Sequence, residues 1–378
     1  MKRFKATGRI ATIFLLLPIL AILLFNVSAS NAEDWPTFRG NSQRTGRSVA
    51  EAQPERQTPI SGQVVWQRSV SGGIQSSPAI FGGLAYFGSN DGTLYAVSEA
   101  EGNLVWRFGT ENWVASSPAV RGGLVVFGSY DGNVYALDAF SGALKWQFTA
   151  QNIVASSPAL ANGLAYFGCL EGNVYCVDTT TGFLKWSFIA GREVYASPTV
   201  ADGVVYIGNH DGKMLALNAS TGELIWRAIV GGPVTTAPAV ANGYVYFGSW
   251  DGKLYCAEIK NQAVIWRYDS GGSIESSPLV ENGRVYFGNL KGAMTALDAK
   301  NGRVIWQTET GQTIMSSPSI RGSQLFFGNN ANEIYSLDAA SGNVLWKIMA
   351  DGPVTTAPAV GADAIFVTGL DGIIRRIR

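Results

Sequence analysis

Residues 117–148 read SPAVRGGLVVFGSYDGNVYALDAFSGALKWQF, and this stretch decides the fold. It contains four short apolar runs rich in β-forming residues, and glycine-containing turns separate them. Asp131-Gly132 stands between the second and third runs, and such a pair between two apolar runs is a strong hairpin signal. The stretch therefore predicts four consecutive antiparallel strands that form one small sheet.

The same unit recurs every 40 residues along the chain. A tryptophan series marks the last run of each unit and comprises Trp66, Trp106, Trp146, Trp186, Trp226, Trp266, Trp306 and Trp346. A proline series marks the first run and comprises Pro78, Pro118, Pro158, Pro198, Pro238, Pro278, Pro318 and Pro358. Neither series contains an insertion or a deletion. Four antiparallel strands in a repeat of about 40 residues are typical of a β-propeller blade.

The last unit, residues 357–378, contains three of the four expected strands. The fourth is present near the start of the chain as residues 63–68, QVVWQR. We expect this N-terminal strand to pair beside the C-terminal hairpin, because closing the ring removes two free sheet edges. The predicted fold is a single all-β, eight-bladed propeller over residues 62–378, with four antiparallel strands per blade.

The N-terminus has the pattern of an export signal. Four cationic residues precede the apolar residues 10–25, and the small-residue segment 27–32 follows. Ala29 and Ala32 both fit a cleavage site, and we favour Ala32, which predicts a signal peptide over residues 1–32. An uncleaved membrane anchor is the alternative, because the apolar stretch is slightly long. No cysteine follows this stretch closely, which excludes a lipid-anchored N-terminal cysteine.

A lead-in segment, residues 33–61, is predicted between the signal and the propeller. We expect Trp35 and Phe38 to pack this segment against the propeller. The export signal predicts a periplasmic or extracellular protein with no membrane span after cleavage. The chain carries 28 Lys and Arg against 28 Asp and Glu, so it lacks the basic surplus of a nucleic-acid-binding protein.

The three cysteines are too few for a disulfide framework. Cys176 and Cys256 stand where other units have alanine, so we predict that they are small buried residues. Cys169 and Cys176 flank a hairpin turn, and a strained bridge between them is an alternative that the spacing leaves open.

The chain shows no constellation of catalytic or metal-binding residues. His210 is its one histidine, so histidine-based metal clusters and Ser-His-Asp arrangements lack parts. A glycine-rich phosphate-binding loop lies directly before a helix, and we find no helical periodicity in this chain. The Asp-Gly turns supply one carboxylate per hairpin, whereas calcium takes about six to eight oxygens. We therefore predict no catalytic residue and no metal site.

Residues 136–146, ALDAFSGALKW, resemble the tryptophan-docking motif of quinoprotein propellers. The motif recurs at residues 216–226 and 296–306. The resemblance covers residues 62–378 and is specific for the pyrroloquinoline-quinone-like (PQQ-like) β-propeller repeat superfamily. The segment DWPTFRGN, residues 34–41, is similar to the lead-in of exported members.

The resemblance implies one of two functions. Some members are dehydrogenases that hold PQQ and calcium over the ring centre, and others are non-catalytic binding modules, including the propeller lipoprotein of the outer-membrane β-barrel assembly machine. This chain lacks the adjacent cysteine pair, the insertions and the length of the catalytic members. It resembles the non-catalytic branch, which implies a monomeric scaffold without a cofactor that binds a protein or polysaccharide partner. The alternative is a PQQ-dependent dehydrogenase with calcium. A soluble part of outer-membrane assembly is a special case of the scaffold, weakened by the absent lipid-anchor cysteine.

Loop residues that depart from the common unit indicate where a partner binds. In a propeller, the loop entering a blade and the turn between its second and third strands lie on one face, so we expect the departing side chains together on that face. Aromatic residues with arginine are typical of protein interfaces and also suit an extended polymer. Ordinary variation of exposed loops is the alternative. The candidate partner-binding residues are Trp113, Tyr130, Arg192, Glu193, His210 and Trp250.

Overall fold

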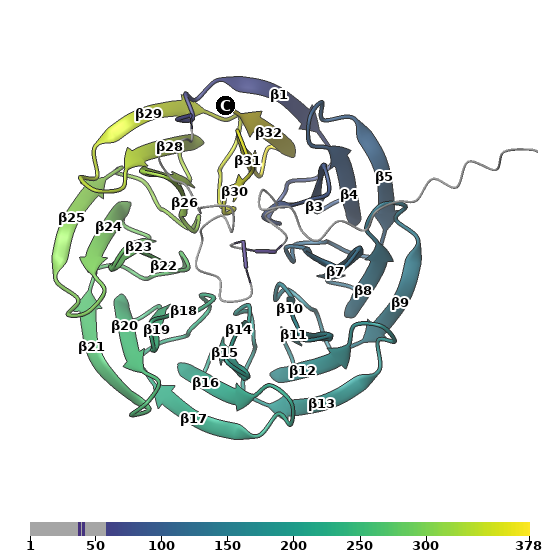
Figure 1. Ribbon diagram of the computed structural model, residues 1–378, viewed down its shortest axis with the longest axis horizontal. Helices are drawn as coiled ribbons and strands as arrows, with labels where there is room; N and C mark the ends of the chain where they lie inside the picture. The colour runs from purple at the N-terminus through teal and green to yellow at the C-terminus, as the bar shows by residue number, and fades with distance from the viewer. Residues whose placement is uncertain (1–36, 39, 42–57) are drawn as a thin grey trace, which may run out of the picture.

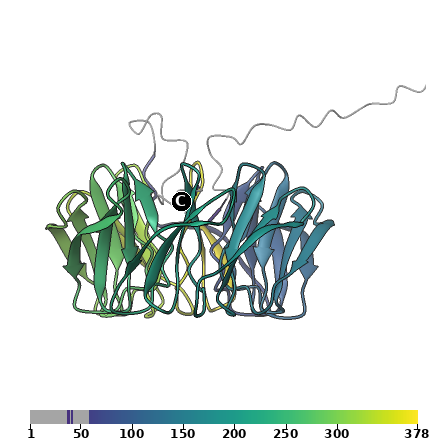
Figure 2. The ribbon, with the colours of Figure 1, turned by 90° about the horizontal axis from the view of Figure 1, so that it is seen from below.

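The computed structural model describes residues 37–38, 40–41 and 58–378. Across these residues the chain forms 32 strands and no helix. Eight four-stranded antiparallel sheets stand around a central axis (Figure 1), and the side view in Figure 2 shows them as a flat cylinder. The eight-bladed propeller predicted from the repeat is therefore confirmed. The predicted signal peptide and Trp35 lie outside the described residues.

Three strands of each blade follow one another outward from the axis. The innermost strands are β2 (Ala79–Phe81), β6 (Ala119–Arg121), β10 (Ala159–Ala161), β14 (Thr199–Ala201), β18 (Ala239–Ala241), β22 (Leu279–Glu281), β26 (Ser319–Arg321) and β30 (Ala359–Val360). The second strands are β3 (Leu84–Gly88), β7 (Leu124–Gly128), β11 (Leu164–Gly168), β15 (Val204–Gly208), β19 (Tyr244–Gly248), β23 (Arg284–Gly288), β27 (Gln324–Gly328) and β31 (Ile365–Thr368). The third strands are β4 (Thr93–Ser98), β8 (Asn133–Asp138), β12 (Asn173–Asp178), β16 (Lys213–Asn218), β20 (Lys253–Glu258), β24 (Ala293–Asp298), β28 (Glu333–Asp338) and β32 (Ile373–Ile377).

A fourth strand forms the outer edge of each blade. These strands are β5 (Leu104–Gly109), β9 (Leu144–Thr149), β13 (Leu184–Ile189), β17 (Leu224–Ile229), β21 (Ala263–Asp269), β25 (Val304–Glu309), β29 (Val344–Met349) and β1 (Val64–Ser69). Blades are numbered 1 to 8 in chain order, so blade 1 is β2–β5 and blade 8 is β30–β32 with β1. No helix in the described part of the chain has the length and apolarity needed to cross a membrane.

The N-terminal strand closes the ring as predicted. β1 pairs with β32, with Ser69 opposite Ile373 and Val64 opposite Ile377 (Figure 1). Ile60, just before this strand, is held by blade 7: its N–H donates to Gln324 Oε1 at 2.7 Å, and its carbonyl accepts from Gln324 Nε2 at 2.9 Å. Blade 8 is thus built from both ends of the chain and anchored to the blade before it.

The repeated tryptophans pack one blade against the next. Trp106 donates its indole N–H to the carbonyl of Ala139 in the next blade, at 2.9 Å. Its ring lies on Gly142, where a Cβ would come within 2.7 Å of Trp106 Cδ2. Trp346 makes the same contacts with Ile60 and Gly62, so the docking motif also operates at the closure.

Trp226 is the one member of the described tryptophan series without this indole hydrogen bond. Residue 262, where the other blades have glycine, is Gln262 with a φ of 54°. The turn changes shape there, because the third and outer strands of blade 5 pair one residue further, with Glu258 opposite Ala263.

Hydroxyl groups near the axis also connect neighbouring blades. Ser77 N donates to Ser117 Oγ at 2.9 Å, and five further junctions repeat this bond. Blade 5 has Ala237 at this position and therefore offers no hydroxyl to blade 4. There Thr199 Oγ1 donates to the Pro238 carbonyl at 2.6 Å instead.

The hairpin turns have the backbone that their sequence predicts. Gly132 has a φ of 87°, and Asn332, which replaces glycine in blade 7, has a φ of 66°.

All three cysteines are buried and free. Cys176 lies opposite Trp186 in the sheet, so a small side chain is required there, and the prediction that this cysteine replaces an alanine is confirmed.

Candidate functional site

Backbone hydrogen bonds join the loop entering each blade to the turn between that blade's second and third strands. Tyr130 N donates to Trp113 O at 2.8 Å, and His210 N donates to Glu193 O at 3.0 Å. Trp250 N donates to Pro233 O, in the loop entering blade 5, at 2.9 Å. These bonds place the predicted binding residues on one face of the ring.

Five aromatic side chains on this face form two contacting groups, one at blade 2 and one at blades 4 and 5. The ring centroids of Trp113 and Tyr130 are 5.8 Å apart. Those of Tyr195 and His210 are 4.9 Å apart, and those of His210 and Trp250 are 5.4 Å apart. Burial raises the pKa of Tyr130, and the Tyr195 hydroxyl raises it further. We call these five residues the aromatic row.

Tyr195 belongs to the row but is not among the residues predicted from the sequence. The same position of the repeat has Ala115, Ala155 and Thr235 in neighbouring blades, so Tyr195 departs from the pattern as clearly as Trp113 does. A comparison of the units that included this position would have found it.

Much of the aromatic row is exposed. Trp113, Trp250 and Tyr195 have exposed fractions of 45%, 41% and 38%. Scattered exposed aromatics are ordinary, but contiguous apolar patches mark interaction sites. The ring distances show that these side chains are grouped on one face, and their role in binding stays a prediction.

Two charged residues border the row at blade 4. Arg192 Nε lies 3.3 Å from Glu193 Oε2, and that oxygen lies 3.9 Å from His210 Nδ1. Burial lowers the pKa of His210, and Arg192 lowers it further, against the opposing effect of Glu193. His210 is therefore neutral near pH 7 and acts as a flat ring between Tyr195 and Trp250.

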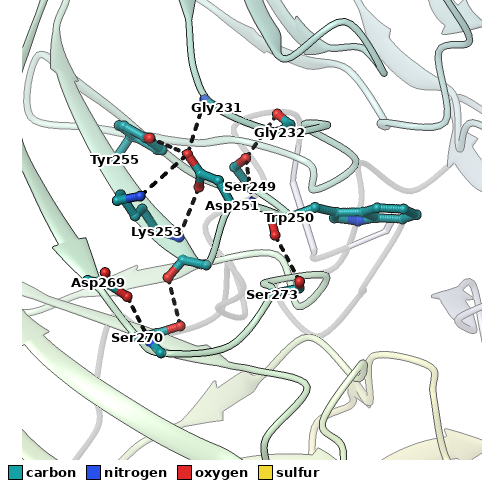
Figure 3. Close-up of polar contacts among 12 residues, drawn as sticks. Gly231, Gly232, Ser249, Trp250, Asp251, Lys253, Tyr255, Asp269, Ser270 and Ser273 are labelled. Atoms are coloured by element: carbon teal, nitrogen blue, oxygen red, sulfur yellow. Dashed lines mark hydrogen bonds and ion pairs between the residues drawn. The ribbon is translucent and has the colours of Figure 1, made fainter.

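A polar network holds the backbone that carries Trp250 (Figure 3). Its indole N–H donates to Thr235 Oγ1 at 3.0 Å, and its carbonyl accepts from Ser273 Oγ of the next loop at 2.8 Å. The neighbouring Asp251 accepts from Gly231 N at 3.1 Å. Figure 3 shows the indole pointing away from this cluster. The bonded turn thus holds Trp250 with its side chain partly exposed.

A groove of about 600 Å³ begins beside Trp250 and runs between blades 5 and 6. Asp269 and Lys291 line it together with Ser273 and Leu290. Its lining carries both signs of charge.

The described residues contain no cluster of side chains of the kind that holds a metal ion. Nowhere in residues 58–378 or the short described segments before them do three His, Cys, Asp or Glu side chains gather. The turn carboxylates are used locally: Asp131 accepts from Asn133 N at 2.9 Å and from Tyr135 OH at 2.8 Å. Calcium needs several such oxygens around one point. The absence of a cofactor nevertheless stays a prediction.

A family model described as outer membrane protein assembly factor BamB matches residues 55–189, 130–237, 216–321 and 312–378. These matches cover most of the sequence. The chain belongs to this family. The predicted membership of the PQQ-like propeller superfamily is confirmed. No curated protein matches the chain in a sequence search.

Solved structures of both functional kinds share this fold. BamB from Moraxella catarrhalis has a TM-score of 0.75 at 18% identity, over 84% of this chain and 99% of that chain. Quinohemoprotein alcohol dehydrogenase from Comamonas testosteroni has a TM-score of 0.80 at 14% identity, over 91% and 80%. A europium-containing methanol dehydrogenase has a TM-score of 0.74 at 13% identity, over 89% of each chain. Identities this low indicate the fold alone, so the function depends on the site.

Proposed function

We propose that this protein is an exported, non-catalytic scaffold that binds a protein partner through the aromatic row. The observation that carries the proposal is the two groups of exposed ring contacts, Trp113 with Tyr130 and His210 with Tyr195 and Trp250. Tryptophan and tyrosine dominate the energetic centres of protein interfaces, because they bury large areas with little loss of conformational freedom.

Export is supported by the signal-like residues 1–32 and by the description of the family as an outer membrane assembly factor. The periplasm is therefore the proposed location. The dehydrogenase alternative has neighbours of similar fold, but the side chains of the described face offer no set of carboxylates for calcium. A non-catalytic scaffold requires only a binding surface, such as the exposed aromatic row.

Site-specific photo-crosslinking in the native envelope tests the proposal. The photoreactive residue p-benzoylphenylalanine replaces Trp250 in one variant and Trp113 in another, so each keeps an aromatic ring in the row. A third variant carries it at Phe183, which is 73% exposed on the opposite face and serves as the matched control. We expect the same protein to crosslink from positions 250 and 113 but not from 183.

Crosslinking from position 183 alone, or to a glycan instead of a protein from the row, would contradict the proposal. The enzymatic alternative is tested by adding PQQ and calcium and by measuring bound quinone and dye reduction with alcohols or sugars. Saturable binding with turnover would replace the scaffold by the dehydrogenase.

A further inference from the structure

A pocket of about 490 Å³ lies between blades 2 and 3. Residues 121–124, between the first and second strands of blade 2, form one of its walls. Successive antiparallel strands reverse direction, so this turn lies on the face opposite the aromatic row. The size is in the range of small-molecule sites, which is roughly 300–1,000 Å³. The lining includes Arg121, Leu124, Asp138, Lys145, Leu160 and Thr180.

A comparison of the blades explains why this junction is open. Thr180 occupies in blade 3 the position that Phe140 occupies in blade 2. The Phe140 ring lies on blade 1, with its centroid 6.1 Å from that of Phe81, and a Cβ at Gly82 would come within 2.9 Å of Phe140 Cε1. One junction later, a Cβ at Gly122 would meet nothing within 4 Å. The pocket thus corresponds to the place that a phenylalanine ring covers between blades 1 and 2.

Arg121 supplies a positive charge to the wall of this pocket. Its side chain is exposed, and its Nη1 donates to the carbonyl of Leu160 in blade 3 at 3.1 Å. Within the described part of the chain, this is the one hydrogen bond of its side chain, and it makes no ion pair. A guanidinium group has five N–H donors, so most of those of Arg121 remain available to a ligand.

The same position in blade 7 shows what an arginine can do there. Arg321 is buried and donates from Nη1 to the carbonyl of Thr58 at 2.7 Å and from Nη2 to the carbonyl of Ala362. It therefore holds oxygen atoms of two separate chain segments in the junction between blades 7 and 8. Arg121 has one such oxygen in place of two.

The carboxylates around Arg121 already have cationic partners. Asp138 Oδ2 lies 3.2 Å from Lys145 Nζ. Asp178, in the turn that contains Thr180, lies 3.2 Å from Lys185 through its Oδ2. These two pairs are neutral overall. Among the described residues of the pocket, the charge of Arg121 is therefore the one that is not compensated.

We propose that this pocket binds a small organic carboxylate with a short apolar body. The planar guanidinium group matches a carboxylate through two parallel N–H···O bonds. Leu124 and Leu160 in the lining would cover the apolar body, and removing apolar surface from water favours binding. The site is separate from the aromatic row and does not depend on the proposed protein partner.

Two probes that differ only in charge test the site. N-acetylleucine carries a carboxylate at pH 7, and N-acetylleucinamide has the same body without the charge. Each is titrated into the full chain while the backbone amide resonances of Gly122 and Gly163, which line the pocket, are followed by NMR. Gly243, the counterpart of Gly163 in blade 5, is the reference resonance. We expect N-acetylleucine to shift the two pocket resonances and to bind at least about tenfold more tightly than the amide.

Two pairs of variants assign the binding to this pocket. Arg121→Gln should remove the preference for the carboxylate, whereas Arg303→Gln, an exposed arginine of blade 6 on the same face, should leave it unchanged. Thr180→Phe should block binding by covering the pocket as Phe140 covers the preceding junction. Ser220→Phe places the same ring at the same position of blade 4 and should leave binding unchanged. Thermal melting of Thr180→Phe should show an intact ring, with a melting temperature no lower than that of the natural protein.

Several results would overturn the proposal. They are equal affinity for the two probes, a preference that survives Arg121→Gln, and unchanged binding to Thr180→Phe. Inorganic phosphate that binds as tightly as N-acetylleucine would show a site for any anion, without a role for the apolar walls. Unshifted pocket resonances would also refute it, and they are the result expected if another carboxylate of this chain already occupies Arg121. Crosslinking from the aromatic row is independent of each of these outcomes.

Discussion

Replacing Gly142 by alanine tests the tryptophan docking that joins the blades. Gly142 has a φ of 70°, and a Cβ there would lie 2.7 Å from Trp106 Cδ2 and 2.8 Å from Cε3. Gly123→Ala in the same blade is the matched control, because Gly123 has a φ of 77° and open space around its added Cβ. The two substitutions share the backbone strain and differ in the clash.

The magnitudes follow from these two contributions. A left-handed backbone costs an alanine about 1–2 kcal/mol, which is the whole effect expected for Gly123→Ala. The clash with the buried Trp106 ring adds about 1–3 kcal/mol, typical of an overpacked core. Gly142→Ala should therefore lower the free energy of unfolding by about 2–5 kcal/mol in total.

Urea denaturation followed by tryptophan fluorescence measures both variants against the natural protein. A third variant combines Gly142→Ala with Trp106→Phe, whose smaller ring leaves room for the methyl group, and the added penalty should largely disappear. Equal losses for Gly142→Ala and Gly123→Ala would refute the reasoning, because they would show that the indole does not pack on residue 142 closely enough to matter.

Two further predictions concern the ring closure and the aromatic row. Gln324→Leu installs the leucine that blades 1 to 3 have at this position, and it removes both hydrogen bonds between Gln324 and Ile60. The substitution should lower the free energy of unfolding by about 2–4 kcal/mol. Amide hydrogen exchange should become faster in residues 64–69. Exchange unchanged in that strand would argue against the clamp. His210 has a lowered pKa in the folded protein, so the natural protein should lose stability as the pH falls from about 6.5 through that lower value, whereas His210→Phe should not lose it over this range. A parallel pH dependence in both proteins would assign the titration to another group. The charged and titratable groups facing His210 are Glu193, Arg192 and Tyr195.

The face that carries the candidate site could be predicted from the repeat, but the ring contacts on it could not. Trp113, Tyr130, His210 and Trp250 stand out when the units are compared, and the propeller geometry places them on one face. His210 and Trp250 belong to different blades, and only the rotation between successive blades brings their ring centroids to 5.4 Å. The distance between rings of different blades depends on the angle between those blades.

Contacts between distant segments of the chain could not be predicted from the sequence either. Gln324 looks like a polar substitution for leucine until Ile60 is seen to bond to it across the closure.

The sequence by itself determined the number of blades, their strand order and the closure by residues 63–68. Each unit of 40 residues has apolar strands that it cannot bury alone, so stacking identical units around an axis was the available solution. Only the tertiary structure decided which side chains of different blades meet. Those contacts depend on the angle between blades and on the shape of each turn, and no local pattern in the chain records either.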